Sequence, residues 1–263
     1  MRQATVAYDH DMNPRLDRLA SIGVLALATD ASIEKDWRTV LSMSGVGFYV
    51  GRVENETEVS VDNLRAIESR IGAGLDALLP HSRLDCIAFA CTSAALFIGE
   101  AQVDQLVRAA RPGVEVTNPL TAARAALAAL GSRRIAMLTP YVDAVNVPMA
   151  EALEDSGVEV AVMGSFFNSS DPEVVRIGES SIRRAALDLA SRAPVDAVFI
   201  ACTALGASHL VPSLEDAIGQ PVTTSNHAMA WHALRLCGVD ERFAGRGRLF
   251  TVAPNAVDPA LAV

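Results

Sequence analysis

Short apolar runs alternate along the chain with longer segments in which apolar residues recur every three or four positions. The short runs predict strands and the longer segments predict helices, because side chains alternate across a strand but share one face of a helix at that spacing. The predicted strands cover residues 22–28, 46–53, 84–90, 114–119, 133–140, 158–167, 195–201 and 220–226. The main predicted helices cover residues 61–79, 101–110, 121–131, 147–157, 181–193 and 228–238. Strands and helices that alternate in this way predict an α/β protein built on parallel sheets.

The same order of units occurs twice. "RLDCIAFACTSA" is followed by a helix and then "GVEVTNP", and "PVDAVFIACTAL" is followed by a helix and then "GQPVTTSN". Before these segments, "SIGVLALATDA" in the first half parallels "RRIAMLTPYVD" in the second. We therefore predict two similar doubly wound lobes related by pseudo-two-fold symmetry, the first over residues 1–120 and the second over residues 121–263.

Each half carries one Cys-Thr pair directly after an apolar strand, and the two cysteines, Cys91 and Cys202, are 111 residues apart. Ligands of parallel α/β sheets bind at the carboxyl ends of the strands, so the symmetry would turn both thiols toward one cleft. A helix that starts at each thiol would lower the pKa of that thiol. The backbone N–H groups that follow would bind a carboxylate, and they belong to Thr92, Ser93, Thr203 and Ala204.

A single cysteine in such a place is more often a small buried packing residue, which is how we interpret Cys86 and Cys237. Two cysteines at equivalent positions of a repeat favour a catalytic pair. One thiol would remove a proton from one face of a carbon while the other delivers a proton to the opposite face, which is racemisation. Alternatively, one thiolate would add to an activated double bond, which leads to cis–trans isomerisation. Neither reaction needs a cofactor.

Composition excludes several other functions. The net charge is −9 without a basic cluster, which argues against nucleic acid and anionic membrane surfaces as partners. No apolar run reaches the length of a membrane span, and the N-terminal segment lacks the pattern of a signal peptide, so we expect a cytoplasmic protein. The four cysteines lack the spacing of a zinc site, and we predict no metal. Lys35 is the only lysine and lies between two acidic residues, which disfavours Schiff-base chemistry.

The paired Cys-Thr motifs, "TPY" at 139–141 and "TTSNHAMAWHALR" at 223–235 resemble the aspartate/glutamate racemase superfamily. The similarity is greatest to its branch of maleate cis–trans isomerase, arylmalonate decarboxylase and the ectoine-utilisation A proteins. This resemblance implies that Cys91 is the nucleophile and Cys202 its proton-handling partner. It also implies that Tyr141 and Asn168 contact a substrate carboxylate. Because the decarboxylases keep only the second-half cysteine, the presence of both thiols favours an isomerase.

Asp30 departs from the maleate isomerases, which carry an asparagine in the loop after the first strand. An ionised carboxylate there would repel a dicarboxylate, and the racemases of the superfamily place an aspartate near this point. Asp30 therefore favours proton transfer at a carbon, or a substrate with a positive or neutral group. Alternatively, Asp30 is an ordinary cap of the helix that begins at "SIEKDW".

The prediction from the whole sequence is a cofactor-independent isomerase or racemase that acts on a small carboxylate. An arylmalonate-type decarboxylase and a non-catalytic two-lobed binding protein are the alternatives. Helices rich in Ala and Leu, such as residues 121–131, are compatible with a homo-oligomer, although burial within a lobe explains them equally well.

Overall fold

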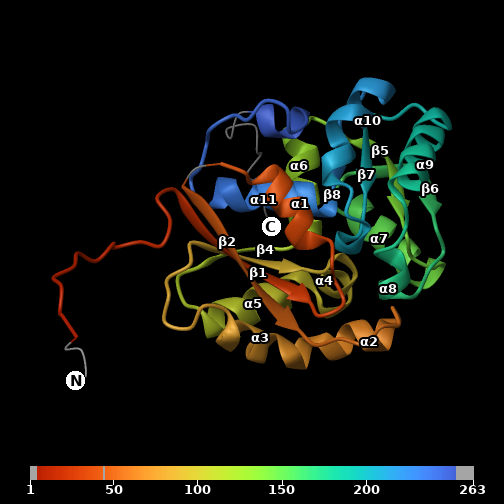
Figure 1. Cartoon of the computed structure of the whole chain (residues 1–263). Coiled ribbons are helices and arrows are strands. Elements are labelled where there is room, and N and C mark those ends of the chain that lie inside the picture. Colours follow the sequence, from red (N-terminus) through yellow and green to blue (C-terminus); the bar gives the residue numbers. More distant parts are fainter. Residues whose placement is uncertain (1–4, 44, 253–263) are drawn as a thin grey trace.

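A computed structural model describes residues 5–43 and 45–252, which form two parallel sheets flanked by helices (Figure 1). The first sheet contains, in order, β2 (Val46–Val53), β1 (Ala20–Leu27), β3 (Cys86–Ala90) and β4 (Glu115–Thr117). The second contains, in order, β6 (Glu159–Ser165), β5 (Arg134–Thr139), β7 (Ala197–Ile200) and β8 (Val222–Thr224). All neighbouring strands are parallel, and the order is the same in both halves. The predicted strands and the two-lobed α/β class are confirmed.

Helices connect the strands in both halves. The first half contains α1 (Ile33–Val40), α2 (Val61–Ala66), the 3₁₀ turn η1 (Ile67–Arg70), α3 (Ile71–Ala77), α4 (Thr92–Ile98), α5 (Glu100–Ala110) and α6 (Pro119–Ala129). The second half contains α7 (Asp143–Glu154), α8 (Asp171–Val174), α9 (Glu179–Ser191), the 3₁₀ turns η2 (Thr203–Leu205) and η3 (Ser208–Leu210), α10 (Val211–Ile218), α11 (Ser225–Leu236) and the 3₁₀ turn η4 (Arg248–Thr251). The single helix predicted over residues 61–79 is divided by η1.

β1 shows why a strand of a parallel sheet appears in the sequence as a continuous apolar run. All its residues are buried, and successive side chains enter two different cores. Leu25 and Leu27 pack in one core, whereas Val24 and Ala26 pack in the other. A strand that is covered by helices on both faces needs apolar residues at every position, because alternate side chains point to opposite faces.

The two halves are joined by an exchange of helices. α11 follows the last strand of the second sheet, yet Ala228 and Trp231 on this helix pack in one core with Ile22 and Ala88 of the first sheet. α6, which follows the last strand of the first sheet, packs against α11. The start of α11 is therefore held beside the first sheet, where Cys91 follows β3.

The predicted boundary between residues 120 and 121 falls inside α6, and all eight strands lie on the expected sides of it. The division into 1–120 and 121–263 stays a prediction, and residues 1–4 and 253–263 of those two ranges lie outside the described residues. Across the described part of the chain, no helix is both long enough and apolar enough to cross a membrane.

Candidate active site

Cys91 directly follows β3 and caps the N-terminus of α4. Its backbone is extended, with a φ of −147°, and its Sγ accepts a hydrogen bond of 3.4 Å from the backbone N–H of Ala94. The Ser93 hydroxyl lies 3.7 Å from the same sulfur. The structure therefore places this thiol where we predicted it, at the end of a strand and the start of a helix.

Cys202 lies at the corresponding end of β7, but its backbone is different. Its φ is +100°, a region that side chains rarely adopt, and the next residues form the short turn η2. Such a conformation costs about 1–3 kcal/mol and persists where the surrounding structure holds it. We expected a helix directly after Cys202, and the structure has only the three-residue 3₁₀ helix η2 there; after Gly206 in the left-handed conformation and η3, the α-helix α10 begins at Val211.

Ser225, the first residue of α11, connects the two cysteine loops. Its hydroxyl oxygen accepts a hydrogen bond of 3.0 Å from the backbone N–H of Cys202 and one of 2.9 Å from the hydroxyl of Thr92. The Thr203 hydroxyl reaches in the other direction and donates to the Ala90 carbonyl at 3.4 Å. The exchange of α11 between the halves thus brings the two Cys-Thr pairs together.

The two thiols and Tyr141 influence one another electrostatically. Cys91 contributes to the raised pKa of Cys202, and both cysteines contribute to the raised pKa of Tyr141. Tyr141 is only 2% exposed and lies in the loop between β5 and α7. The structure therefore gathers Cys91, Cys202 and Tyr141 in one buried site, together with Thr92, Ser93 and Thr203.

Both thiols are protonated at neutral pH, contrary to the lowered pKa that we expected. Burial raises the pKa of Cys91 to about 12 and outweighs the hydrogen bonds from Ala94 and Ser93. Burial also raises the pKa of Cys202 well above its ordinary value, against the opposing effects of Tyr141 and of the Ala204 N–H. The negative charge of Asp171 raises both pKa values further. In this state, desolvation dominates over the helix N-terminus.

Asp30 has two different roles for its two carboxyl oxygens. Oδ1 accepts hydrogen bonds from the backbone N–H groups of Ser32 (2.7 Å) and Ile33 (3.0 Å) at the start of α1. Oδ2 is buried and makes no hydrogen bond of good geometry, although the Thr203 side chain lies close enough to lower the pKa of Asp30, and the residue is 4% exposed. Burial raises the pKa of Asp30, and its charge contributes to the raised pKa of Cys91. The N-cap of α1 is Ser32, so Asp30 holds the turn that leads into the helix rather than capping it, and its charge acts on the first thiol.

Asp171 is a residue of the site that the sequence analysis missed. Its Oδ2 accepts hydrogen bonds from the Thr29 hydroxyl (2.9 Å) and from the Asn55 amide (3.3 Å), both in the first half. Burial raises the pKa of Asp171, and the charge of Asp30 raises it further. In the sequence, Asp171 precedes a proline and has the pattern of a helix start, which gives no sign that it faces two thiols in space.

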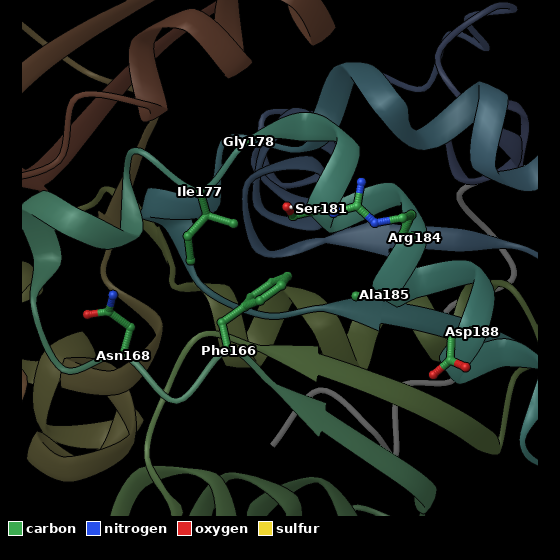
Figure 2. A pocket seen from close by; sticks show the side chains of 8 residues that line it. All are labelled: Phe166, Asn168, Ile177, Gly178, Ser181, Arg184, Ala185 and Asp188. Carbon is green, nitrogen blue, oxygen red and sulfur yellow. Dashed lines mark hydrogen bonds between the residues drawn. The ribbon is translucent and has the colours of Figure 1, made fainter.

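The hydrogen bonds of Asn168 do not connect it to the thiols. Its amide donates to Glu173 at 3.0 Å, and its carbonyl oxygen accepts from the backbone N–H of Ser170 at 2.8 Å. Asn168 lines a surface hollow of about 580 Å³, together with Phe166, Ile177 and residues of α9 (Figure 2). A contact between Asn168 and a substrate carboxylate stays a prediction.

Ala204 faces Ser32, whose hydroxyl donates to the Ala204 carbonyl at 2.8 Å.

A backbone contact joins the two halves at the segment that contains Asp171. The loop before α2 meets the loop before α8 through an antiparallel bridge between Glu58 and Ser170 (Figure 1). The backbone N–H of Val59 donates to the Ser169 carbonyl at 2.7 Å, and that of Asp171 donates to the Thr57 carbonyl at 3.0 Å. The two catalytic candidates, Cys91 and Cys202, are only 5% and 6% exposed.

No site for a metal ion was found in the described residues: nowhere in 5–43 and 45–252 do three His, Cys, Asp or Glu side chains come together as ligands. His227 and His232 lie on α11, and burial lowers the pKa of each to about 4, so both are neutral at pH 7. His227 lies between the hydroxyl of Thr223 (3.0 Å) and the carbonyl of Arg246 (2.6 Å), and the hydroxyl of Thr117 lies 2.8 Å from His232. These contacts make the histidines part of the core.

Comparison with known proteins places this site in a family. The family model described as arylmalonate decarboxylase matches residues 56–250. Arylmalonate decarboxylase from Bordetella bronchiseptica is 30% identical over 195 residues, which cover 73% of this chain and 77% of that protein. The chain belongs to the arylmalonate decarboxylase family. The membership confirms the branch that the Cys-Thr motifs indicated.

This member of the arylmalonate decarboxylase family is also similar to isomerases. Maleate isomerase from Alcaligenes faecalis is 24% identical over 187 residues, covering 68% of this chain and 74% of that protein. Among solved structures, a maleate cis–trans isomerase variant from Nocardia farcinica with a covalently bound succinylcysteine intermediate has a TM-score of 0.79. That structure is 22% identical, and the match covers 88% of this chain and 98% of the isomerase. The likeness to this structure concerns the fold.

Proposed function

We propose that this protein is a cofactor-independent isomerase of a small carboxylate and that Cys91 and Cys202 are its two catalytic residues. The observation that carries the proposal is the convergence of the two thiols from equivalent strand ends, tied together through Ser225. The similarity to maleate isomerase supports the reaction class. Two acid–base groups of the same type on opposite sides of a substrate suit either racemisation or cis–trans isomerisation.

In the proton-transfer version, one thiolate takes the proton from a carbon next to the substrate carboxylate, and the opposing thiol delivers its own proton to the other face. The carbon loses one C–H bond and gains another on its opposite face. At the end the first sulfur is protonated and the second is a thiolate. In the addition version, the Cys91 thiolate forms a C–S bond while the π pair of the double bond moves toward the adjacent carboxylate; the resulting single bond rotates, and return of the pair re-forms the double bond as the C–S bond breaks. Tyr141 interacts with both thiols and is therefore a candidate to contact the substrate.

The test is a panel of small carboxylates and amino acids incubated with the enzyme in deuterated water and followed by proton NMR. Racemisation introduces deuterium at the reacting carbon, whereas the addition route changes double-bond geometry without exchange of the same hydrogen. Cys91→Ser should abolish turnover by either route, and Cys237→Ser, outside the site, should leave it unchanged. Full activity of Cys91→Ser would refute the two-thiol proposal. If no compound turns over but Cys91→Ser binds as tightly as the native protein, the chain is a binding protein.

Decarboxylation is the second candidate, because the family model and the Bordetella relative are both arylmalonate decarboxylases. In that reaction one carboxylate leaves as carbon dioxide and one thiol protonates the resulting carbanion. Release of carbon dioxide from phenylmalonate that depends on Cys202 but not on Cys91 would establish it. Loss of activity in both cysteine variants would favour the isomerase.

A further inference from the structure

Asp36 is a buried acidic side chain that the site described above does not use. It lies on α1 in the first half and is only 1% exposed. Burial raises the pKa of Asp36, and hydrogen bonds from Asn226 and Ser208 act in the opposite direction. Acidic side chains are almost never fully buried unless other groups hold them, so the partners of Asp36 indicate what it does. Both partners belong to the second half, because α1 packs against η3 and α11.

One carboxyl oxygen of Asp36 holds both ends of the turn that follows Cys202. Oδ2 accepts hydrogen bonds from the Ser208 hydroxyl (2.8 Å), from the Ser208 backbone N–H (3.2 Å) and from the Asn226 amide (3.0 Å). The same amide nitrogen of Asn226 also donates to the Thr203 carbonyl at 2.8 Å. Thr203 begins η2 and Ser208 begins η3, so a side chain of the first half fixes the first and the last residue of this turn.

Asn226 and its neighbour Ser225 hold the backbone on both sides of Cys202. Ser225 accepts the backbone N–H of Cys202 at 3.0 Å, and Asn226 binds the carbonyl of the next residue, Thr203. The Asp36 carboxyl orients this amide, because a carboxylate and a carbonyl both accept and both therefore require the NH₂ group. A backbone with the positive φ of Cys202 persists only where its surroundings fix it, and Asp36 belongs to those surroundings.

The first thiol is held in a different way. α7 follows β5 as α1 follows β1, and the buried polar residue of α7 is Asn146. The Asn146 amide donates to the Tyr141 carbonyl at 2.8 Å, and its carbonyl oxygen accepts from the Thr139 hydroxyl, so both bonds stay within its own half. Cys91 itself caps the regular helix α4. The Asp36 carboxyl is therefore expected to act on one thiol of the pair.

We propose that Asp36 is a positioning residue for Cys202, because it holds residues 203–208 in the turn that directs the Cys202 thiol toward the substrate. The inference rests on the proposed function, since it assigns Asp36 to the step that Cys202 performs. Asp36 acts through Asn226 and Ser208 and does not itself take part in the reaction. Loss of its carboxylate should therefore impair the step of Cys202 and leave the step of Cys91 intact.

Asp36→Asn is the decisive variant. Asparagine has the same shape, and its amide oxygen still accepts hydrogen bonds from Ser208 and Asn226, so the variant should fold while it loses the stronger acceptor. Ser208→Ala approaches the same carboxyl group from the other end of the turn and removes one of its hydrogen bonds. It should have the same effect to a smaller extent, and it carries the test if Asp36→Asn does not fold.

Glu215→Gln is the matched control, because it removes another buried carboxylate. Glu215 is 5% exposed, and its carboxyl group accepts the backbone N–H groups of Val222 (3.1 Å) and Arg248 (2.9 Å), which lie outside both cysteine loops. This variant should lower the free energy of unfolding but should not distinguish between the two thiols.

The substrate arm measures the exchange of deuterium into each pure enantiomer. In Asp36→Asn, kcat for the enantiomer that Cys202 serves should fall by on the order of 10-fold with KM unchanged, as expected for a weakened hydrogen bond to a charged group. Exchange of the other enantiomer should not change. In a Cys91→Ser background the remaining exchange should therefore fall, whereas in a Cys202→Ser background Asp36→Asn should have no effect. Equal losses in both backgrounds would overturn the proposal.

A second arm does not depend on the substrate. The protein is treated with iodoacetamide, and peptide mass spectrometry follows the alkylation of Cys91 and Cys202 in the same sample. We expect Asp36→Asn to raise the rate at Cys202 relative to Cys91 by on the order of 10-fold, because a loosened turn exposes this thiol. General loss of stability raises both rates and leaves their ratio unchanged, which is the result expected for Glu215→Gln. An unchanged ratio in Asp36→Asn, or a change at Cys91 alone, overturns the proposal.

The two arms separate this proposal from the proposed function. If Cys202→Ser keeps full turnover while Asp36→Asn raises the alkylation of Cys202 selectively, the hold of Asp36 on the turn stands and the two-thiol function is wrong. If both cysteine variants lose turnover while Asp36→Asn affects both enantiomers and both thiols alike, the two-thiol function stands. Asp36 is then a residue of the core without a particular role for Cys202.

Discussion

The loops around Cys91 and Cys202 begin alike and then diverge. Both follow central strands of sheets with the same strand order. Cys91 has an extended backbone and caps a regular helix, whereas Cys202 has a φ of +100° and enters a 3₁₀ turn. The symmetric fold therefore presents two equivalent thiols in two different backbone settings. Such a difference suits a pair of groups that perform different steps on one substrate.

Ser225 shows how the difference is maintained. It accepts the backbone N–H of Cys202 at 3.0 Å and the side-chain hydroxyl of Thr92 at 2.9 Å. On the second loop it thus holds the backbone at the thiol itself, but on the first loop it holds only the neighbouring side chain. The strained Cys202 backbone depends on this contact from α11, while the Cys91 backbone is supported by α4.

The largest expected effect comes from replacing each thiol in turn. If the enzyme is a racemase, Cys91→Ser and Cys202→Ser should each reduce racemisation by about 10³-fold, within the usual range for an acid–base group. Each variant should still exchange the hydrogen of one enantiomer, because the remaining thiol serves one face of the carbon. NMR in deuterated water, starting from each pure enantiomer, measures this. If both variants lost exchange of the same enantiomer, the two thiols would not serve opposite faces of the carbon.

Alkylation by iodoacetamide tests the protonation state of the thiols. The pKa of Cys91 is raised to about 12, so its thiolate fraction should increase tenfold with each pH unit through the neutral and mildly alkaline range. The alkylation rate should then rise by about 100-fold between about pH 7 and about pH 9. A short cysteine peptide, with a pKa of about 8.5, should level off in that interval. A Cys91 rate that levels off as the peptide does would show that the thiolate is already formed.

Ser225→Ala removes the link between the loops. It leaves the buried N–H of Cys202 and the hydroxyl of Thr92 without their acceptor, and we expect the free energy of unfolding to fall by about 2 kcal/mol. Urea denaturation measures the change. Ser191→Ala is the control, since its hydroxyl donates to the Asp188 carbonyl at 2.7 Å on the exposed side of α9. Equal stability of the two variants would mean that the link contributes nothing.

The smallest expected effect tests the backbone strain at Cys202. Cys91→Gly and Cys202→Gly both remove a buried thiol, but only position 202 has a positive φ, which glycine adopts without the strain that a side chain causes there. Relief of strain should make Cys202→Gly less destabilising than Cys91→Gly by about 1 kcal/mol. Chemical denaturation of both variants gives the difference. The reverse order would show that the positive φ at Cys202 carries no strain.

Sequence reasoning located most of the fold, because strand and helix signals are local. Every strand of the two sheets was placed, and the repeat of the Cys-Thr pairs identified both thiols and the lobes around them. Sequence reasoning failed at the point where the two halves have the same local pattern of residues but different backbone conformations. "FACTSA" and "FIACTAL" both predict a helix after the cysteine, but an α-helix follows only in the first half, and the second half has a three-residue 3₁₀ helix there.

The sequence by itself determined the alternation of strands and helices, the duplication, the family and the two candidate thiols, since each depends on the order of residues along the chain. The tertiary structure decided what lies around those thiols. Asp171 reaches the site from 80 residues beyond Cys91, and Ser225 reaches it because α11 packs on the opposite half. Burial raises pKa values that a helix start alone would lower, and the extent of burial is set by contacts between distant segments.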